Sequence, residues 1–192
     1  MSFNVVTTGL KFPEGPVALP GGDVLVVELH RGTLSRVAPD GTTTVVAEVG
    51  GGPNGAAVGP DGRVYIANCG GMYAFEVMGY TFAGGIPEDY TGGSIQAVDL
   101  ETGAVETLYT ECDGLALRGP NDIVFDAHGG FYFTDHGKSD GITCDKGRVY
   151  YASADGSSIR LVAGDMNGPN GIGLSPDGSR LYVSETFTAR VW

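Results

Sequence analysis

Oxygen-bearing side chains recur in this sequence at the second place of a short motif that appears four times. The motif is Pro, then Glu or Asn, then Gly or Asp, and its copies occupy residues 13–15, 53–55, 120–122 and 169–171. A supersecondary unit repeated around an axis brings equivalent positions to a common centre. We therefore expect the second residues of the four copies to approach one another, namely Glu14, Asn54, Asn121 and Asn170. Carboxylate and amide oxygens are the ligands that hard cations such as Ca²⁺ prefer, so the pattern predicts a cation site.

Each motif copy leads into a second recurring feature, a strand that ends on an acid or an amide. A turn containing Gly comes seven residues after the Glu or Asn, and a β-branched or aromatic run follows it. These runs end at Glu28, Asn68, Asp135 and Glu185. Most side-chain hydrogen bonds in proteins go to the backbone or to water. We expect these four side chains to bind backbone amides of the next loop and to hold neighbouring repeats together, without a part in catalysis.

Short strands and Asp-Gly turns, which favour hairpins, fill the intervals between the motifs. In the first repeat we expect strands at 17–19, 24–29, 33–37 and 44–47, and in the third at 123–126, 131–134, 148–152 and 159–163. The fourth repeat has strands at 172–174 and 181–184 and begins a third at 188–192. Repeats of about 40–45 residues with four strands are typical of propeller blades. The sequence thus predicts one all-β domain over 1–192, a β-propeller with about four blades of four antiparallel strands.

Two regions leave alternatives open. The interval from Asn54 to Asn121 is 67 residues against 40 and 49 for its neighbours, and the excess is an insertion at about 72–93, which is either a lid over the site or a loop packed on the outside. Residues 3–7 are suited to complete the fourth blade of a closed four-bladed ring. Alternatively the chain is the front part of a longer ring, which we favour because it stops inside a strand. An open ring would leave blade edges that could support self-association.

Composition excludes several classes of partner. The formal net charge is −12, whereas nucleic acids and anionic membrane surfaces attract basic patches, so we expect neither as a partner. No stretch reaches the roughly 18 apolar residues that a membrane helix needs. Three cysteines, Cys69, Cys112 and Cys144, lack any paired spacing, which favours a reducing compartment and a cytoplasmic location.

Three segments carry a resemblance to a known family. Residues 13–16 (Pro-Glu-Gly-Pro), 120–126 (Pro-Asn-Asp-Ile-Val-Phe-Asp) and 169–178 (Pro-Asn-Gly-Ile-Gly-Leu-Ser-Pro-Asp-Gly) resemble the SMP-30/gluconolactonase (regucalcin-like) family. The resemblance implies a six-bladed propeller with one divalent cation, usually calcium, in its central channel. It also implies hydrolysis of sugar lactones, or of organophosphates in a related branch. Set against six blades, we expect this chain to be truncated at its C-terminus.

The resemblance also implies roles for individual residues. Glu14 and Asn170 match two metal ligands of the family, whereas Asn121 and Asp122 match a pair that lines the substrate pocket. In the organophosphatase branch the residue at Asn121 also binds the metal. The sequence departs from the family at Gly119, where an Arg often stands. The catalytic Asp, both general base and metal ligand, falls beyond Trp192, so the catalytic residue of this chain is unknown.

From these residues we expect a calcium-dependent hydrolase that acts on sugar lactones or similar esters. A bound cation with neutral amide ligands polarises a carbonyl and acidifies water. Three alternatives remain: organophosphate ester hydrolysis at the same site, another divalent metal, and a non-catalytic propeller that binds ligands or partners. A single Asn at a strand entry more often bonds a neighbouring turn, which is the interpretation we prefer for Asn54.

Overall fold

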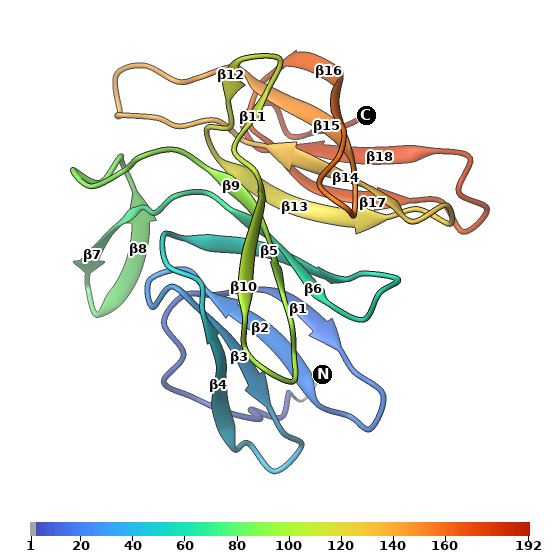
Figure 1. The fold of residues 1–192 in the computed structure, drawn as a ribbon. Coiled ribbons are helices and arrows are strands. Elements are labelled where there is room, and N and C mark those ends of the chain that lie inside the picture. The colour runs from blue at the N-terminus through green and yellow to red at the C-terminus, as the bar shows by residue number, and fades with distance from the viewer. Residues whose placement is uncertain (1–2) are drawn as a thin grey trace.

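The computed structural model describes residues 3–192, in which all regular secondary structure is β. Its strands form four antiparallel sheets and two small hairpins (Figure 1). The part of the chain described here contains no helix that could span a lipid bilayer. The predicted fold class, an all-β propeller arrangement with four blades, is therefore confirmed.

The first and third blades follow the predicted plan of four strands in chain order. Blade 1 consists of β1 (Pro13–Ala18), β2 (Val24–Glu28), β3 (Thr33–Val37) and β4 (Thr43–Glu48). Blade 3 consists of β13 (Pro120–Phe125), β14 (Gly130–Asp135), β15 (Gly147–Ser153) and β16 (Ile159–Met166). The inner strands begin at the Pro of the motif, several residues before the predicted starts. Proline suits this place because the first residue of a strand need not donate a hydrogen bond to the ladder.

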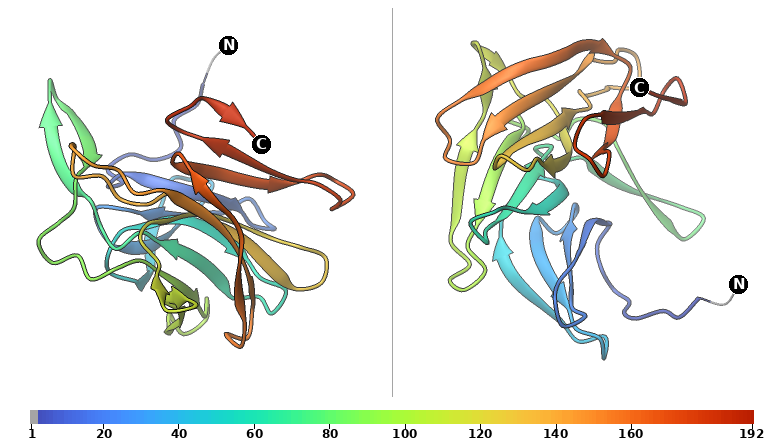
Figure 2. Two further views of the ribbon diagram at one scale, coloured as in Figure 1. Left: turned by 90° about the horizontal axis from the view of Figure 1, so that it is seen from above. Right: turned by 90° about the vertical axis from the view of Figure 1, so that its right-hand side faces the viewer.

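Blades 2 and 4 vary the plan. Blade 2 is ordered β5 (Pro53–Val58), β6 (Val64–Asn68), β9 (Ser94–Val98) and β10 (Val105–Tyr109), with the hairpin of β7 (Tyr73–Val77) and β8 (Tyr80–Gly84) inserted after β6. This hairpin is exposed and projects from one rim (Figures 1 and 2). A second hairpin, β11 (Glu111–Cys112) and β12 (Leu115–Ala116), follows β10. Blade 4 has three strands, β17 (Pro169–Leu174), β18 (Leu181–Glu185) and β19 (Arg190–Val191).

The four inner strands lie side by side in the order β1, β5, β13, β17, and glycine lets their backbones approach. A Cβ added at Gly15 would lie 2.7 Å from the backbone N of Ala56 in the next blade. A Cβ at Gly55 would lie 2.4 Å from the backbone O of Asn121. Real Cβ atoms do not come so close to backbone atoms, so only glycine fits. The glycines at the third place of the first two motif copies are thus explained by contact between blades.

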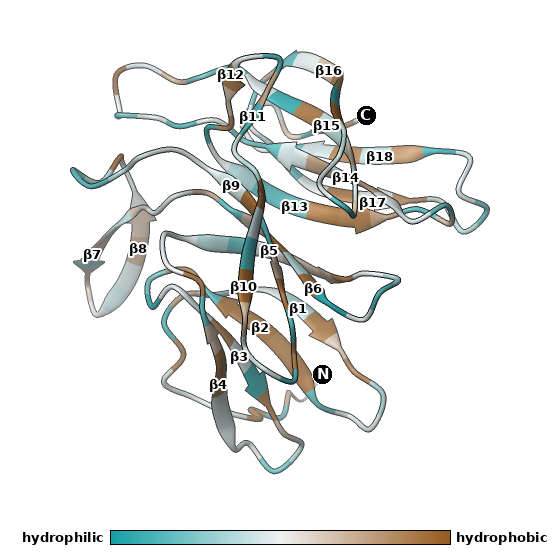
Figure 3. Ribbon diagram, in the orientation of Figure 1, coloured by the Kyte–Doolittle hydropathy of each residue, from teal (hydrophilic) through white to brown (hydrophobic). Residues whose placement is uncertain are grey.

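Apolar side chains fill the space between successive blades. Blades 1 and 2 enclose Leu25, Val27, Leu34 and Ile66, and blades 2 and 3 enclose Tyr65, Phe131, Phe133 and Tyr150, all fully buried. β1, β2 and β13 accordingly carry long apolar segments (Figure 3). Burying each such side chain contributes about 1.5–3 kcal/mol. These interfaces fix the angle between blades and so the position of the inner strands.

The alternative of a ring closed by residues 3–7 is wrong for this structure. The segment forms no strand, and it lies along blade 1, where the hydroxyls of Thr7 and Thr43 are 3.2 Å apart. No strand between residues 3 and 192 pairs with the outer edge of β19. The reason is geometric: the blades follow one another in an arc, which places the N-terminal segment and β19 at opposite ends (Figure 1).

Candidate functional site

Each inner strand contains an irregularity at the motif. The register with the second strand shifts between Glu14 and Val17, Pro53 and Gly55, Pro120 and Ile123, and Pro169 and Ile172. A β-bulge turns a side chain away from the regular alternation of the strand and is common beside active sites. The four bulges bring the second motif residues to one cavity of about 430 Å³, lined by Glu14, Asn54, Asn121 and Asn170. The predicted convergence of these four residues is thus observed, including Asn54, which we had interpreted as structural.

Glu14 supplies the negative charge of this cavity. Burial raises the pKa of its carboxyl, and the nearby charge of Asp122 raises it further, while the backbone N–H of Gly15 acts in the opposite direction. No cationic side chain among residues 3–192 forms an ion pair with Glu14. A partly buried carboxylate without a counter-ion favours the approach of a cation.

The amides around Glu14 offer oxygen atoms. Asn170 donates from Nδ2 to the hydroxyl of Thr186 at 3.2 Å, which leaves its Oδ1 as a free acceptor. One carboxylate with three amides is a donor set that suits Ca²⁺, which accepts carboxylate, amide and water oxygens. In the described part of the chain, no three His, Cys, Asp or Glu side chains are grouped so that they could hold a metal. A cation would therefore depend on the amide oxygens as well as on Glu14.

Asp122, the predicted substrate-binding partner of Asn121, makes contacts between blades. Its carboxylate accepts hydrogen bonds from the backbone N–H of Ile123 and of Ile172, both at 2.9 Å. The second bond joins β13 to β17. Asp122 is not among the residues that line the cavity. Its contact with a substrate stays a prediction, whereas Asn121 lies in the cavity wall.

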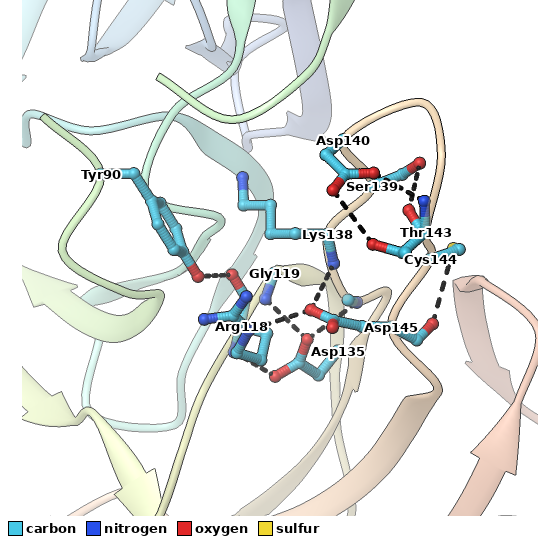
Figure 4. A network of polar contacts seen from close by, with 11 residues as sticks. Tyr90, Arg118, Gly119, Asp135, Lys138, Ser139, Asp140, Thr143, Cys144 and Asp145 are labelled. Carbon is cyan, nitrogen blue, oxygen red and sulfur yellow. Dashed lines mark hydrogen bonds and ion pairs between the residues drawn. The ribbon is translucent and has the colours of Figure 1, made fainter. Parts of the chain in front are cut away.

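The strand-ending side chains hold the segments that lead into the inner strands. The carboxylate of Asp135 accepts hydrogen bonds from the backbone N–H of Arg118 at 2.7 Å, Gly119 at 2.6 Å and Gly137 at 3.0 Å (Figure 4). The equivalent bonds elsewhere are Lys11 to Glu28, Gly52 to Asn68 and Asn167 to Glu185. Binding to backbone amides is confirmed, but most of these amides precede the inner strand of the same blade. These strand-ending side chains therefore help to fix the position of the segment from which each motif enters the cavity wall.

Arg118 does not replace the family's Arg in the cavity wall. Its guanidinium pairs with Asp145 at 2.9 Å and lies 5.5 Å from the ring centroid of Tyr90. Tyr90 in turn donates its hydroxyl to the backbone O of Arg118 (Figure 4). The three side chains tie the segment after the β7–β8 hairpin to blade 3.

Two further polar residues of the cavity come from the loop after β14. His136 directly follows the strand-ending Asp135 and lies in the cavity wall. Burial lowers the pKa of its imidazole, which packs edge-on against Phe187 with ring centroids 5.2 Å apart. Lys138 also lines the cavity and was missed. Its position three residues after a strand-ending acid matches that of Arg31 after Glu28 in blade 1, but Arg31 pairs with Glu28, so the repeat gave no signal for a residue in the cavity.

The sequence comparison decides the family of this chain. Residues 12–192 match the family model described as SMP-30/Gluconolactonase/LRE-like region. The chain belongs to this family. The resemblance carried by the three motifs is thereby confirmed, and it extends over nearly all of the sequence.

Relatives of this SMP-30/gluconolactonase family member are longer than it is. A gluconolactonase of Zymomonas mobilis is 26% identical over 98% of this chain and 53% of its own length. The lactonase drp35 of Staphylococcus saprophyticus is 32% identical over 88% of this chain and 47% of its own length. The solved structure of a gluconolactonase from Xanthomonas campestris matches with a TM-score of 0.72 at 24% identity, over 95% of this chain and 57% of that one, which shows the shared fold. The chain spans about half the length of the curated relatives it matches.

Proposed function

We propose that this protein is a calcium-dependent hydrolase that opens sugar lactones or similar esters. Glu14, Asn121 and Asn170 would hold the ion, with Asn54 as a further oxygen donor beside them. The observation that carries the proposal is the convergence of one unpaired carboxylate and three amides in a single cavity. The names of the relatives, gluconolactonase and lactonase, supply the substrate class.

The residues of the cavity suit this chemistry. A bound Ca²⁺ would polarise the lactone carbonyl and lower the pKa of a water molecule. Asn121 would orient the substrate, and the apolar side chains of Phe12, Leu29, Met72 and Phe187 would exclude bulk water from one side of it. Glu14 is the only carboxylate among the described residues that line the cavity. No residue of the cavity wall is therefore assigned as the general base.

The test compares thermal unfolding of the chain in excess calcium and in excess chelator. A ligand at a hundred times its dissociation constant stabilises by about 2.7 kcal/mol, which raises the Tm of a chain of this size by roughly 5–11 °C. We expect this shift in the wild type and in the exposed control Glu101→Gln, and no shift in Glu14→Gln. If calcium raised the Tm of Glu14→Gln as much as that of the wild type, Glu14 would not be a ligand of the ion.

Activity assays then separate the remaining alternatives. If the chain hydrolyses glucono-δ-lactone and a chelator abolishes this activity, the proposal is supported. If the activity persists in chelator, the metal mechanism is refuted. Hydrolysis of a phosphotriester without lactone hydrolysis would favour the organophosphatase alternative. Neither activity, together with no calcium shift, would favour a binding propeller. A cytoplasmic location and self-association through the open blade edges belong to the same proposal, and sedimentation of the purified chain tests the latter.

A further inference from the structure

Lys138 is the only lysine or arginine among the described residues that line the cavity, and burial lowers the pKa of the one other basic group there, the imidazole of His136. Lys138 is only 5% exposed to solvent. The ammonium Nζ donates to the backbone O of Gly71 at 2.6 Å and lies 4.9 Å from the ring centroid of Tyr90. Burial lowers the pKa of the ammonium, while the neighbouring Cys69 thiol and the charge of Asp135 act in the opposite direction.

This ammonium has no carboxylate partner among residues 3–192. The nearby acids are engaged elsewhere: Asp145 pairs with Arg118 and accepts the backbone N–H of Lys138, and Asp135 is occupied by three backbone amides. In Figure 4 the side chain of Lys138 extends away from both carboxylates. The loop thus places two acids within a few residues of a buried cation and pairs neither with it.

Burying an ammonium without a counter-ion is energetically unfavourable, because the group loses its hydration. Holding the Gly71 carbonyl does not explain that cost, because a neutral N–H or O–H donor makes the same bond without a charge. The face of Tyr90 offsets only part of that cost, and a thiol is a weak acceptor. An anion that enters the cavity and accepts a hydrogen bond from Nζ would compensate the buried positive charge of Lys138.

We propose that Lys138 binds a carboxylate on the substrate, so that the cavity selects lactones that carry a carboxylate over neutral lactones. A single cation in the wall matches a monoanion. The lactone part of the ligand rests on the proposed function; the carboxylate part rests on Lys138 alone. Lys138 would be a specificity-determining residue, since it acts on a substituent of the substrate and not on the ester bond.

The test measures binding in chelator, where the proposed hydrolysis does not occur. The probes are D-glucaro-1,4-lactone, which carries a carboxylate, and the neutral D-gulono-1,4-lactone, each titrated calorimetrically into the full chain. We expect the carboxylated lactone to bind at least tenfold more tightly to the wild type. Lys138→Met should abolish this preference while the Kd of the neutral lactone stays within about twofold. Lys138→Gln, which keeps a donor for Gly71, guards against misfolding of the first variant and should give the same result.

Lys146→Met is the matched control, because it removes one lysine charge from the same loop at an exposed position outside the cavity. It should keep the tenfold preference. A wild type that binds both lactones equally, or neither, overturns the proposal, as does a preference that survives in both Lys138 variants. Calcium-dependent hydrolysis without a preference would refute only the role of Lys138. A preference that depends on Lys138 without hydrolysis would refute only the proposed function.

Discussion

Replacing Asp135 by alanine should show how much of the site depends on one buried acid. Its carboxylate is 1% exposed and accepts three backbone N–H groups, from Arg118, Gly119 and Gly137. Hydrogen bonds to a charged group contribute about 1.5–3 kcal/mol each. Because one carboxylate serves all three donors, their contributions do not simply add. We therefore expect a loss of about 4 kcal/mol for Asp135→Ala, a drop in Tm of roughly 8–16 °C.

Asparagine at the same position separates charge from shape. An amide oxygen at Oδ1 can still accept from Gly119 and Gly137, whereas the amide nitrogen would face the N–H of Arg118, so we expect about half the loss. Thermal and urea unfolding give the stability of each variant relative to the wild type, for Asp135→Ala, Asp135→Asn and the exposed control Glu101→Ala. The calcium-induced rise in Tm should also be smaller in the Asp135 variants, since the segment that Asp135 binds leads directly to Asn121. An alanine variant within about 1 kcal/mol of the wild type, a change in Tm of roughly 2–4 °C, would refute this account.

Two further predictions concern the inner strands and the cavity wall. Gly55→Ala places a Cβ 2.4 Å from the backbone O of Asn121 and should lower stability by about 1–3 kcal/mol in urea, whereas Gly173→Ala, which meets nothing within 4 Å, should not. Equal midpoints for the two variants would contradict the close approach of β5 and β13. Burial lowers the pKa of His136 in the folded state, so the unfolded chain binds the proton more readily. Stability should therefore fall as pH drops below about 6.5, the ordinary value, and His136→Gln should flatten this dependence in thermal scans from pH 7 to 5.

The architecture could be predicted because each blade repeats its own local signals. Strand-forming runs, Gly turns and the motif recur at fixed spacing, and the observed strands of blades 1 and 3 include nearly all of the predicted ones. The starts of the inner strands were predicted late because Pro-Asn-Gly is a typical turn sequence. In the folded chain the same three residues form a bulged strand entry, which requires the neighbouring blade to pack against the glycine.

The cavity could be predicted only where the repeat itself carried the information. Glu14, Asn121 and Asn170 stand at equivalent positions, and so does Asn54, which we discounted although it lies in the same wall. Lys138 could not be found in this way. Arg31 occupies the equivalent place in blade 1, but its guanidinium turns back to Glu28 at 3.2 Å.

Lys138 differs from Arg31 because the insertion at about 72–93 supplies its partners. Lys138 reaches the carbonyl of Gly71, just before the β7–β8 hairpin, and the ring of Tyr90, just after it. Both contacts join segments far apart in the sequence. Only the three-dimensional structure shows that this lysine is buried in the cavity, since no local pattern specifies its partners.

Glu14 and Lys138 carry opposite charges in one cavity, yet they do not neutralise each other. Burial raises the pKa of Glu14 and lowers that of Lys138, and the two side chains form no ion pair in the described part of the chain. If the two groups served stability alone, their pairing would relieve both desolvation penalties. Under the two proposals, this separation would leave each charge to a ligand of opposite sign, a cation at Glu14 and a carboxylate at Lys138. A lactone that carries a carboxylate, bound beside a calcium ion, would satisfy both at once.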